Sequence, residues 1–326
     1  MAESAVKRIG VLTSGGDAPG MNAAVRSVVR CGLASGMNMF AIYDGYNGLL
    51  KGEIEQLTTR GVCDIIQRGG TILSTARCLE FKTLEGQQKG VQVAREHGLD
   101  AIVVIGGDGS FMGARALTNL GLPTIGIPGT IDNDIACSEY TIGYDTALNT
   151  AMEAVDKIRD TMTSHNRCCL VEVMGRNAGY IALNVAVATG AETVLIPERK
   201  YDFEKDVLAA VKQSRVAGKK NHIIIVAEGV DMDVMETAKK IGELTGIDTR
   251  ASVLGHMQRG GSPTCKDRVV AAQMGQRAIE LLVAGQSNRI VCIRDGRIDD
   301  VDVNEALAMK KSIDDEEIRL SSMLAI

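Results

Sequence analysis

The sequence predicts an α/β protein in which mainly parallel sheets are covered by helices on both faces. Short runs of aliphatic and β-branched residues, most of them ending in glycine, recur along the chain and alternate with amphipathic stretches of helical length. Strands that are apolar along their whole length are typical of parallel sheets buried on both faces. The 326 residues suffice for about two domains of roughly 150 residues each.

The strands and helices alternate in sequence order, which favours right-handed crossovers and functional groups at the carboxyl ends of the strands. Mixed charges at helical spacing in residues 312–320 predict a solvated terminal helix. We expect strands at 8–12, 101–107, 122–129, 170–175 and 223–229, and helices at 21–33, 110–120, 145–160, 203–217 and 268–284.

The composition excludes several classes of protein. With 45% hydrophobic and 24% charged residues, the chain is neither disordered nor fibrous. A net charge of -5, 3% aromatic residues and no Trp argue against a nucleic-acid partner. A local basic cluster remains compatible with binding of small phosphates.

The cysteines point to a reducing compartment. None of the eight forms a CxxC or zinc-like pattern, so we expect most to be small buried hydrophobic residues. The first residues lack the apolar core of a signal peptide, and no stretch approaches the roughly 18 apolar residues of a membrane span. We therefore expect a cytoplasmic protein with no membrane partner. The cysteines are Cys31, Cys63, Cys78, Cys137, Cys168, Cys169, Cys265 and Cys292.

Two glycine-rich turns follow predicted strands and precede predicted helices. Gly15-Gly16-Asp17 recurs as Gly106-Gly107-Asp108, with Met and Ala at matching later positions. Free backbone N–H groups and the helix dipole make such helix starts anion sites. The first turn matches neither GxGxxG nor GxxxxGK[ST], which disfavours Rossmann dinucleotide binding and a P-loop there. The alternative is a tight turn that needs glycine only for packing.

Two motifs that contain carboxylates are further candidates. Asp108 in the sequence GGDGS suits Mg²⁺, which prefers one or two carboxylates together with phosphate oxygens. If residues 130–134 (TIDND) are extended, Thr130, Asp132 and Asp134 lie on one side, where repulsion between two carboxylates favours protonation of one of them. That arrangement suits a general base. The alternative is an Asx-rich turn.

Arginines next to glycines form the last group of candidate residues. Guanidinium groups suit phosphate oxygens, and neighbouring glycines leave room for a ligand. The histidines at 97, 165 and 222 have no comparable surroundings, and we interpret them as structural. The arginine candidates are Arg77, Arg176, Arg250 and Arg259, the last within GHMQRGG.

Taken together, the motifs closely resemble those of the bacterial ATP-dependent 6-phosphofructokinase family from about Lys7 to about Met309. The resemblance implies two unequal Rossmann-like domains: an ATP-binding domain of residues 1–143 and 257–307, and a fructose 6-phosphate-binding domain of residues 144–256 and 308–326. It also implies a glycolytic kinase, a homotetramer, and sites between subunits. The motifs are TSGGDAPGMNA, VVIGGDGS, PGTIDND, VEVMGR, AEG and LGHMQRGGSP.

The resemblance assigns roles in phosphoryl transfer. Asp132 corresponds to the general base for the sugar 1-hydroxyl, and Asp108 to the carboxylate linked to Mg²⁺, with Asp134 nearby. Gly16 corresponds to a backbone donor to the transferred group, whose charge Arg77 and Arg176 offset; Thr130 completes the catalytic set. The ATP contacts correspond to Gly16, Arg77, Cys78, Gly107, Asp108, Gly109 and Ser110.

The resemblance also assigns the sugar phosphate contacts, of which Arg167 and Arg250 are expected from a neighbouring subunit. The remaining contacts correspond to Thr130, Ile131, Asp132, Met174, Gly175, Arg176, Glu228, His256, Met257, Gln258 and Arg259.

An effector site for ADP or phosphoenolpyruvate is implied as well. At the positions of Thr59 and Ala217, some family members carry Arg and Lys, respectively. At the position of Tyr180, family members often carry Asp. The effector residues correspond to Arg26, Arg30, Arg159, Glu192, Lys219 and Lys220.

Two other functions stay open. One is a pyrophosphate-dependent phosphofructokinase, which resembles this chain but has Asp in place of Gly109 and Lys in place of Gly129. The other is a non-catalytic regulatory paralogue, which is expected to lose Asp108, Asp132 or the arginines; this chain retains all of them.

Overall fold

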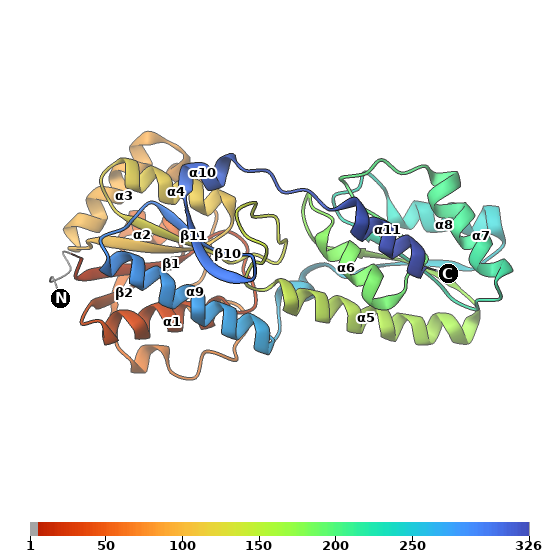
Figure 1. Cartoon of the computed structure of the whole chain (residues 1–326), viewed down its shortest axis with the longest axis horizontal. Coiled ribbons are helices and arrows are strands. Elements are labelled where there is room, and N and C mark those ends of the chain that lie inside the picture. Colours follow the sequence, from red (N-terminus) through yellow and green to blue (C-terminus); the bar gives the residue numbers. More distant parts are fainter. Residues whose placement is uncertain (1–5, 326) are drawn as a thin grey trace. The chain divides into compact units, whose positions relative to one another are not determined.

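The computed structural model describes residues 6–325, which form two compact units (Figure 1). The first unit contains the chain up to residue 131, residues 135–146 and residues 259–311. The second contains residues 132–134, 147–258 and the chain from residue 312. Each unit has its own sheet.

The sheet of the first unit has seven strands in the order β11-β10-β5-β4-β1-β2-β3. Its five inner strands are parallel, whereas the edge strands β3 and β11 are antiparallel to their neighbours. The central strands β4 and β5 are completely buried, as their continuous apolar sequences predict. The strands are β1 (Arg8–Thr13), β2 (Asn38–Ile42), β3 (Ile54–Leu57), β4 (Ala101–Gly106), β5 (Thr124–Pro128), β10 (Arg289–Arg294) and β11 (Arg297–Asp302).

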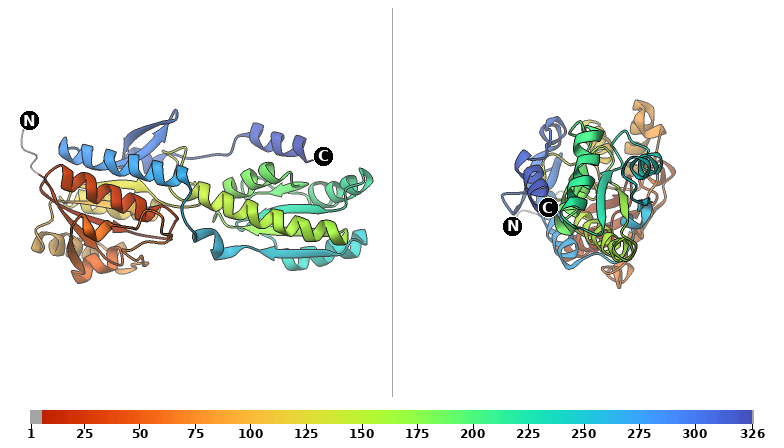
Figure 2. Two further views of the ribbon diagram at one scale, coloured as in Figure 1. Left: turned by 90° about the horizontal axis from the view of Figure 1, so that it is seen from below. Right: turned by 90° about the vertical axis from the view of Figure 1, so that its right-hand side faces the viewer.

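Helices cover both faces of this sheet. α1 and α9 lie side by side on one face (Figure 2), where the Ser27 hydroxyl donates to the Ala272 carbonyl at 2.6 Å. α3, α4 and α10 lie on the other face. The helices are α1 (Met21–Ala34), α2 (Tyr46–Lys51), α3 (Leu84–Glu96), α4 (Asp108–Asn119), α9 (Cys265–Val283) and α10 (Val303–Ala308), with short 3₁₀ turns η1 (Arg60–Val62) and η2 (Glu80–Lys82).

The second unit is built on a parallel sheet in the order β7-β8-β6-β9. Apolar side chains of α7 and α8 pack on one face, and α6 packs against α11 and contacts β7 and β8. The strands are β6 (Cys168–Val173), β7 (Thr193–Leu195), β8 (His222–Ala227) and β9 (Thr249–Val253). The helices are α5 (Tyr144–His165, beginning in the first unit), α6 (Tyr180–Thr189), the π-helical turn η3 (Phe203–Leu208), α7 (Ala209–Val216), α8 (Val234–Thr245), the 3₁₀ turn η4 (Gly255–Arg259) and α11 (Asp315–Leu324).

The predicted α/β fold is confirmed, and the differences lie at element ends. α9 begins at Cys265 because the Thr264 hydroxyl caps it by accepting from the Asp267 N–H at 3.3 Å. The predicted helix at 203–217 is divided into η3 and α7. The prediction of a solvated helix around residues 312–320 is confirmed, because α11 covers Asp315–Leu324 and residues 312–320 are exposed or half-buried; Ser321, the next residue, is buried.

Two further expectations need correction. Residues 130–134 are not extended, because residues 131–132 form a turn and Asn133 has a left-handed φ of 53°. The period-two argument therefore does not apply there. All eight cysteines are free thiols, but four are buried, three are half-buried, and Cys265 is exposed. Within residues 6–325 no helix combines the length and apolar character needed to cross a membrane.

Candidate active site

Three neighbouring strands of the first unit, β1, β4 and β5, end at the same edge of the sheet, and hydrogen bonds join the loops that follow them. The Ser14 N–H donates to the Ile105 carbonyl at 2.9 Å, and the Ser110 hydroxyl donates to the Ser14 carbonyl at 3.1 Å. The Gly129 N–H donates to the Gly106 carbonyl at 3.0 Å. The structure thus brings Gly16, the 107–110 loop and Thr130 to one edge.

The predicted phosphate loop is open to solvent. A Cβ atom added at Gly107 or Gly109 would meet no atom within 4 Å, and the Asp108 side chain is exposed. Asp108 is also the first residue of α4, a helix long enough for its amino end to attract an anion. The loop therefore has space for polyphosphate oxygens next to a carboxylate.

The turn containing Gly16 lies against Arg259. The Nη1 atom of Arg259 donates to the Asp17 carbonyl at 3.2 Å, and a Cβ atom added to Gly16 would clash with this nitrogen. Arg77 is exposed on a nearby segment, since the Thr75 hydroxyl donates to the Gly15 carbonyl at 2.7 Å. Cys78 is half-buried and packs against the core. Two guanidinium-bearing segments thus lie near this turn.

The TIDND segment begins directly after β5. Thr130, Ile131 and Asp132 are all buried, with 8%, 0% and 3% exposed, respectively. A Cβ atom on Gly129 would lie 3.0 Å from a methyl group of Ile105, so little room exists for a side chain at this position. Asp132 belongs to the second unit, and the structure does not place it relative to Asp108.

In the second unit, Glu228 holds the loop that follows β6. Its Oε1 atom accepts from the Gly175 N–H at 3.2 Å and from the Arg176 N–H at 2.7 Å. Arg176 has a left-handed φ of 53°, a conformation that is strained for a residue with a long side chain. Strained backbone of this kind concentrates at ligand-binding sites. Glu228 therefore supports the conformation that exposes the Arg176 side chain.

Gln258 anchors η4 to the same edge. Its fully buried side chain accepts from the Met174 N–H at 3.3 Å and donates to the Gly255 carbonyl at 3.1 Å. His256 and Met257, which precede it in η4, are exposed. The side chain of Gln258 therefore positions its neighbours and is not itself available to a ligand.

Arg167 and Arg250 lie at the opposite edge of this small sheet. Arg167 immediately precedes β6 and Arg250 is the second residue of β9, whereas Arg176 and Glu228 follow the carboxyl ends of β6 and β8. A strand of six residues is about 20 Å long at roughly 3.3 Å per residue. The structure therefore does not bring the two arginines to the Glu228 site of their own chain.

The six predicted effector residues do not form one cluster within either unit. Arg26 and Arg30 are half-buried on α1 of the first unit, and the other four belong to the second unit. There, Lys219 pairs with Glu192 at 3.1 Å, and the Arg159 guanidinium donates to the Thr189 carbonyl. Three residues differ from those expected for the family. Thr59 and Ala217 are exposed, whereas Tyr180 is buried. Burial raises the pKa of Tyr180 to about 12.

Comparison with known proteins decides the family. The phosphofructokinase family model matches residues 8–282 of the chain. The chain belongs to the phosphofructokinase family. This membership confirms the resemblance drawn from the motifs.

The matches to known relatives cover nearly the whole chain. It is 53% identical to "ATP-dependent 6-phosphofructokinase" of Clostridium botulinum strain Hall, over 98% of this chain and 100% of the relative. It is 55% identical to the Bacillus cereus protein of the same name, with the same coverage. The phosphofructokinase structure from Saccharomyces cerevisiae matches with a TM-score of 0.88 and 35% identity, over 98% of this chain and 48% of the longer yeast chain. A pyrophosphate-dependent phosphofructokinase of Marinobacter aquaeolei, 20% identical with a TM-score of 0.86, shares the fold.

Asp248 is not among the residues predicted from the sequence, although its carboxylate oxygen accepts from both Arg167 and Arg250. Asp248 stands two residues before Arg250, a spacing that places both on one side of an extended strand. This two-residue spacing is enough to predict from the sequence that Asp248 and Arg250 lie close together. The contact with Arg167, by contrast, depends on the pairing of β6 with β9.

Proposed function

We propose that this protein transfers the γ-phosphoryl group of ATP to the 1-hydroxyl of fructose 6-phosphate and so forms fructose 1,6-bisphosphate and ADP, the committed step of glycolysis. The observation that carries this proposal is the full-length identity of 53–55% to proteins named for this activity. The retained Asp108, Asp132, Arg77 and Arg176 support it against a non-catalytic paralogue.

The two distinguishing glycines favour ATP over pyrophosphate as the donor. Gly109 borders open space, which leaves room for the rest of a nucleotide beyond its β-phosphate. A Cβ atom added to Gly129 would lie 3.0 Å from a methyl group of Ile105. A lysine at this position therefore requires the neighbouring side chains to move. Both positions thus suit the ATP-dependent branch of the family.

Asp132 acts as the general base that accepts the proton of the 1-hydroxyl. The Gly16 N–H, Arg77 and Arg176 stabilise the negative charge on the transferred group, because phosphoryl transfer depends on positioning and electrostatics. Thr130 lies beside the base. The nucleotide is held by Gly107, Gly109, Ser110 and Cys78, and the sugar phosphate by Ile131, Met174, Gly175, Glu228, His256, Met257 and Arg259. Gln258 contributes by positioning this last group.

The residues present fit a magnesium ion that arrives with ATP. Asp108 is an exposed carboxylate between two open glycines, and the described residues contain no cluster of three or more His, Cys, Asp or Glu side chains able to hold a metal. Mg²⁺ typically combines one or two carboxylates with substrate phosphates, so Asp108 and the nucleotide are sufficient ligands together with water. When bound, the ion neutralises charge on the β- and γ-phosphates.

The sugar phosphate site takes Arg167 and Arg250 from the partner subunit of a homotetramer. Their place at the amino edge of the small sheet, away from Glu228, supports this assignment. ADP or phosphoenolpyruvate acts as effector through the residues on α1 and around Glu192. The eight free cysteines suit a cytoplasmic enzyme.

A donor assay tests the proposal. Purified protein is incubated with fructose 6-phosphate, Mg²⁺ and either ATP or pyrophosphate, and fructose 1,6-bisphosphate is measured. We expect product with ATP only. Product with pyrophosphate alone would assign the protein to the other branch, and no product with either donor would support a regulatory paralogue.

A further inference from the structure

Asn22 stands near the end of the TSGGDAPGMNA motif, and the proposed function leaves it without a role. It is the second residue of α1, and its side chain is only 1% exposed. Burying an amide costs free energy unless hydrogen-bond partners replace water. The partners of the Asn22 amide therefore show which part of the chain this residue serves.

The Asn22 side chain makes three hydrogen bonds to one irregular segment, residues 67–77, in which neither a helix nor a strand forms. Its Oδ1 atom accepts from the Ile72 N–H at 2.7 Å. Its Nδ2 atom donates to the Arg68 carbonyl at 3.1 Å and to the Gly69 carbonyl at 3.3 Å. An amide offers one acceptor and two donors on a single planar group, which is the combination that these three backbone groups require.

The 67–77 segment also contacts two motifs of the proposed active site. The Thr75 hydroxyl donates to the Gly15 carbonyl at 2.7 Å, in the glycine turn after β1. A Cβ atom added at Gly69 would clash with the carbonyl oxygen of Gly261, so this part of the segment lies directly against the loop that follows Arg259. Movement of the segment would therefore be felt at both loops.

Arg77 is the last residue of this segment. Its side chain is exposed, so the backbone before it decides where the guanidinium group can reach. That backbone is held in a turn at Ser74, whose left-handed φ of 55° is strained for a residue other than glycine. The Thr13 hydroxyl donates to the Ser74 carbonyl at 2.8 Å, and the Asn47 amide donates to the Arg77 carbonyl at 3.2 Å. Together with Asn22, these contacts keep the strained turn from relaxing.

We propose that Asn22 is a positioning residue for phosphoryl transfer, because its amide holds the 67–77 segment in the conformation that presents Arg77 to the group transferred beside Gly16. This inference rests on the proposed function, in which Arg77 stabilises the charge on that group. Asn22 does not itself contact substrate. Since small displacements of a charged group weaken stabilisation of the transition state, loss of the Asn22 amide lowers the turnover number.

A double-mutant cycle tests whether Asn22 acts through Arg77. Asn22→Ala is expected to lower the turnover number by about tenfold to a hundredfold. In the Arg77→Ala background the same change is expected to lower it less than about threefold, because the group that Asn22 positions is already absent. Equal losses in both backgrounds would overturn the proposal, since a residue that only stabilises the fold acts independently of Arg77.

Hydrogen exchange of residues 67–77 tests the structural half of the proposal on the full chain without substrates. We expect faster exchange in Asn22→Ala than in the unchanged protein, because the Ile72 N–H loses its acceptor. Unchanged exchange in this segment would overturn the proposal. If Asn22→Ala does not fold, Asn22→Asp takes its place in both experiments. Aspartate keeps the shape and the acceptor for Ile72, but it places a second oxygen against the carbonyls of Arg68 and Gly69.

Ser27→Ala is the matched control on the same helix. Ser27 is buried and donates to the Ala272 carbonyl at 2.6 Å, away from the 67–77 segment. We expect this variant to lower the thermal midpoint but to keep both the turnover number and the exchange of residues 67–77. A loss of turnover equal to that of Asn22→Ala would overturn the proposal. Absence of product from the unchanged protein with either donor is a different result, because it overturns the proposed function itself.

Discussion

Arg167 and Arg250 donate to the same oxygen, Oδ2 of Asp248, at distances of 2.6 and 3.2 Å. Two guanidinium groups at the same edge of a sheet repel each other unless an anion lies between them. Asp248 therefore holds the pair in place in the absence of ligand. The three residues together carry one net positive charge at the amino edge of the small sheet.

We expect Arg250→Ser to weaken binding of fructose 6-phosphate by about tenfold to a hundredfold, because a charge-assisted contact to phosphate contributes roughly 1.5–3 kcal/mol. The apparent affinity for ATP should stay nearly unchanged. Steady-state kinetics with each substrate varied in turn measures both effects. An equal loss of affinity for both substrates would show that Arg250 acts on the fold and not on the sugar phosphate.

Hybrid oligomers test whether Arg250 serves the partner subunit. Two inactive variants, Asp132→Asn and Arg250→Ser, are dissociated, mixed and reassembled. If the site is shared, some sites in the hybrids contain both original residues and activity returns. Persistent inactivity in oligomers verified to contain both variants would assign Arg250 to its own subunit.

Asp132→Asn is expected to retain the fold and lose most of the turnover. An amide cannot accept the proton of the sugar hydroxyl, and general base catalysis contributes about 10²–10⁴-fold. The buried position of Asp132 tolerates an isosteric amide better than a larger side chain. Turnover number and thermal midpoint are measured together; an unchanged turnover number would remove Asp132 from the catalytic role.

Asp108→Ala is expected to impair use of MgATP more than binding of fructose 6-phosphate, because its proposed partner is the metal ion. The side chain is exposed at the start of α4, so its removal should leave the thermal midpoint almost unchanged. Titration calorimetry with MgATP and kinetics over a range of Mg²⁺ concentrations check the effect. Normal MgATP binding together with normal activity would make the loop purely structural.

Protonation of His222 is expected to make the free energy of unfolding depend on pH. Burial lowers the pKa of His222 from its ordinary value near 6.5, and Lys219 and Arg215 lower it further against the opposing effect of Glu192. The unfolded chain thus binds more protons near pH 6 than the folded one. The contribution of His222 to the free energy of unfolding is therefore fully present above about pH 6.5, and it is lost as the pH falls through the lowered pKa.

We therefore expect the thermal midpoint to fall between about pH 6.5 and pH 5, and to fall less in His222→Asn. Asparagine does not titrate, and its amide can still reach the Ser214 hydroxyl that now lies 2.9 Å from Nδ1. Differential scanning calorimetry at constant protein concentration measures both proteins. An identical decline in the two would mean that other groups carry the pH dependence.

Much of the first unit was predictable because its signals are local. The apolar runs that became β1, β4 and β5 are followed by glycine turns, and the turns lie where parallel strands end. The conformation of TIDND was not predictable, because the left-handed Asn133 depends on packing around a buried turn. The burial of Ser321 likewise depends on the contact of α11 with α6, far away in the sequence.

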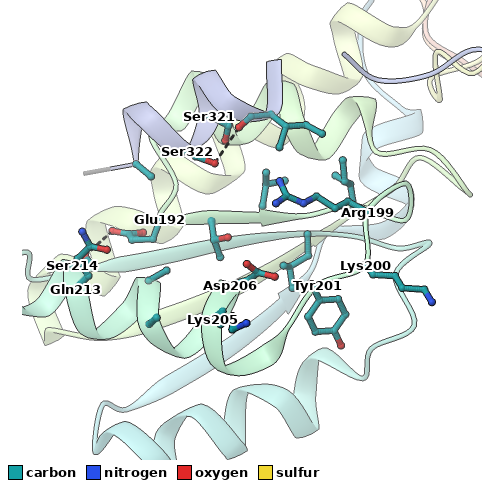
Figure 3. Close-up of a pocket in the computed structure, with 18 of the residues that line it drawn as sticks. Glu192, Arg199, Lys200, Tyr201, Lys205, Asp206, Gln213, Ser214, Ser321 and Ser322 are labelled. Carbon is teal, nitrogen blue, oxygen red and sulfur yellow. Dashed lines mark hydrogen bonds between the residues drawn. The ribbon is translucent and has the colours of Figure 1, made fainter. Parts of the chain in front are cut away.

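The α/β class, the family and the candidate catalytic side chains could be predicted from the amino-acid sequence, because these depend on residue types and spacings along the chain. Which charged groups come into contact depends instead on how the chain folds. Strand order places Arg167 and Arg250 on Asp248 at one edge of the sheet and Glu228 at the other. The packing of α11 against the second unit likewise forms part of the wall of a cavity that Arg199 and Lys205 also line (Figure 3). Such encounters arise between segments that are distant in sequence, and no local pattern specifies them.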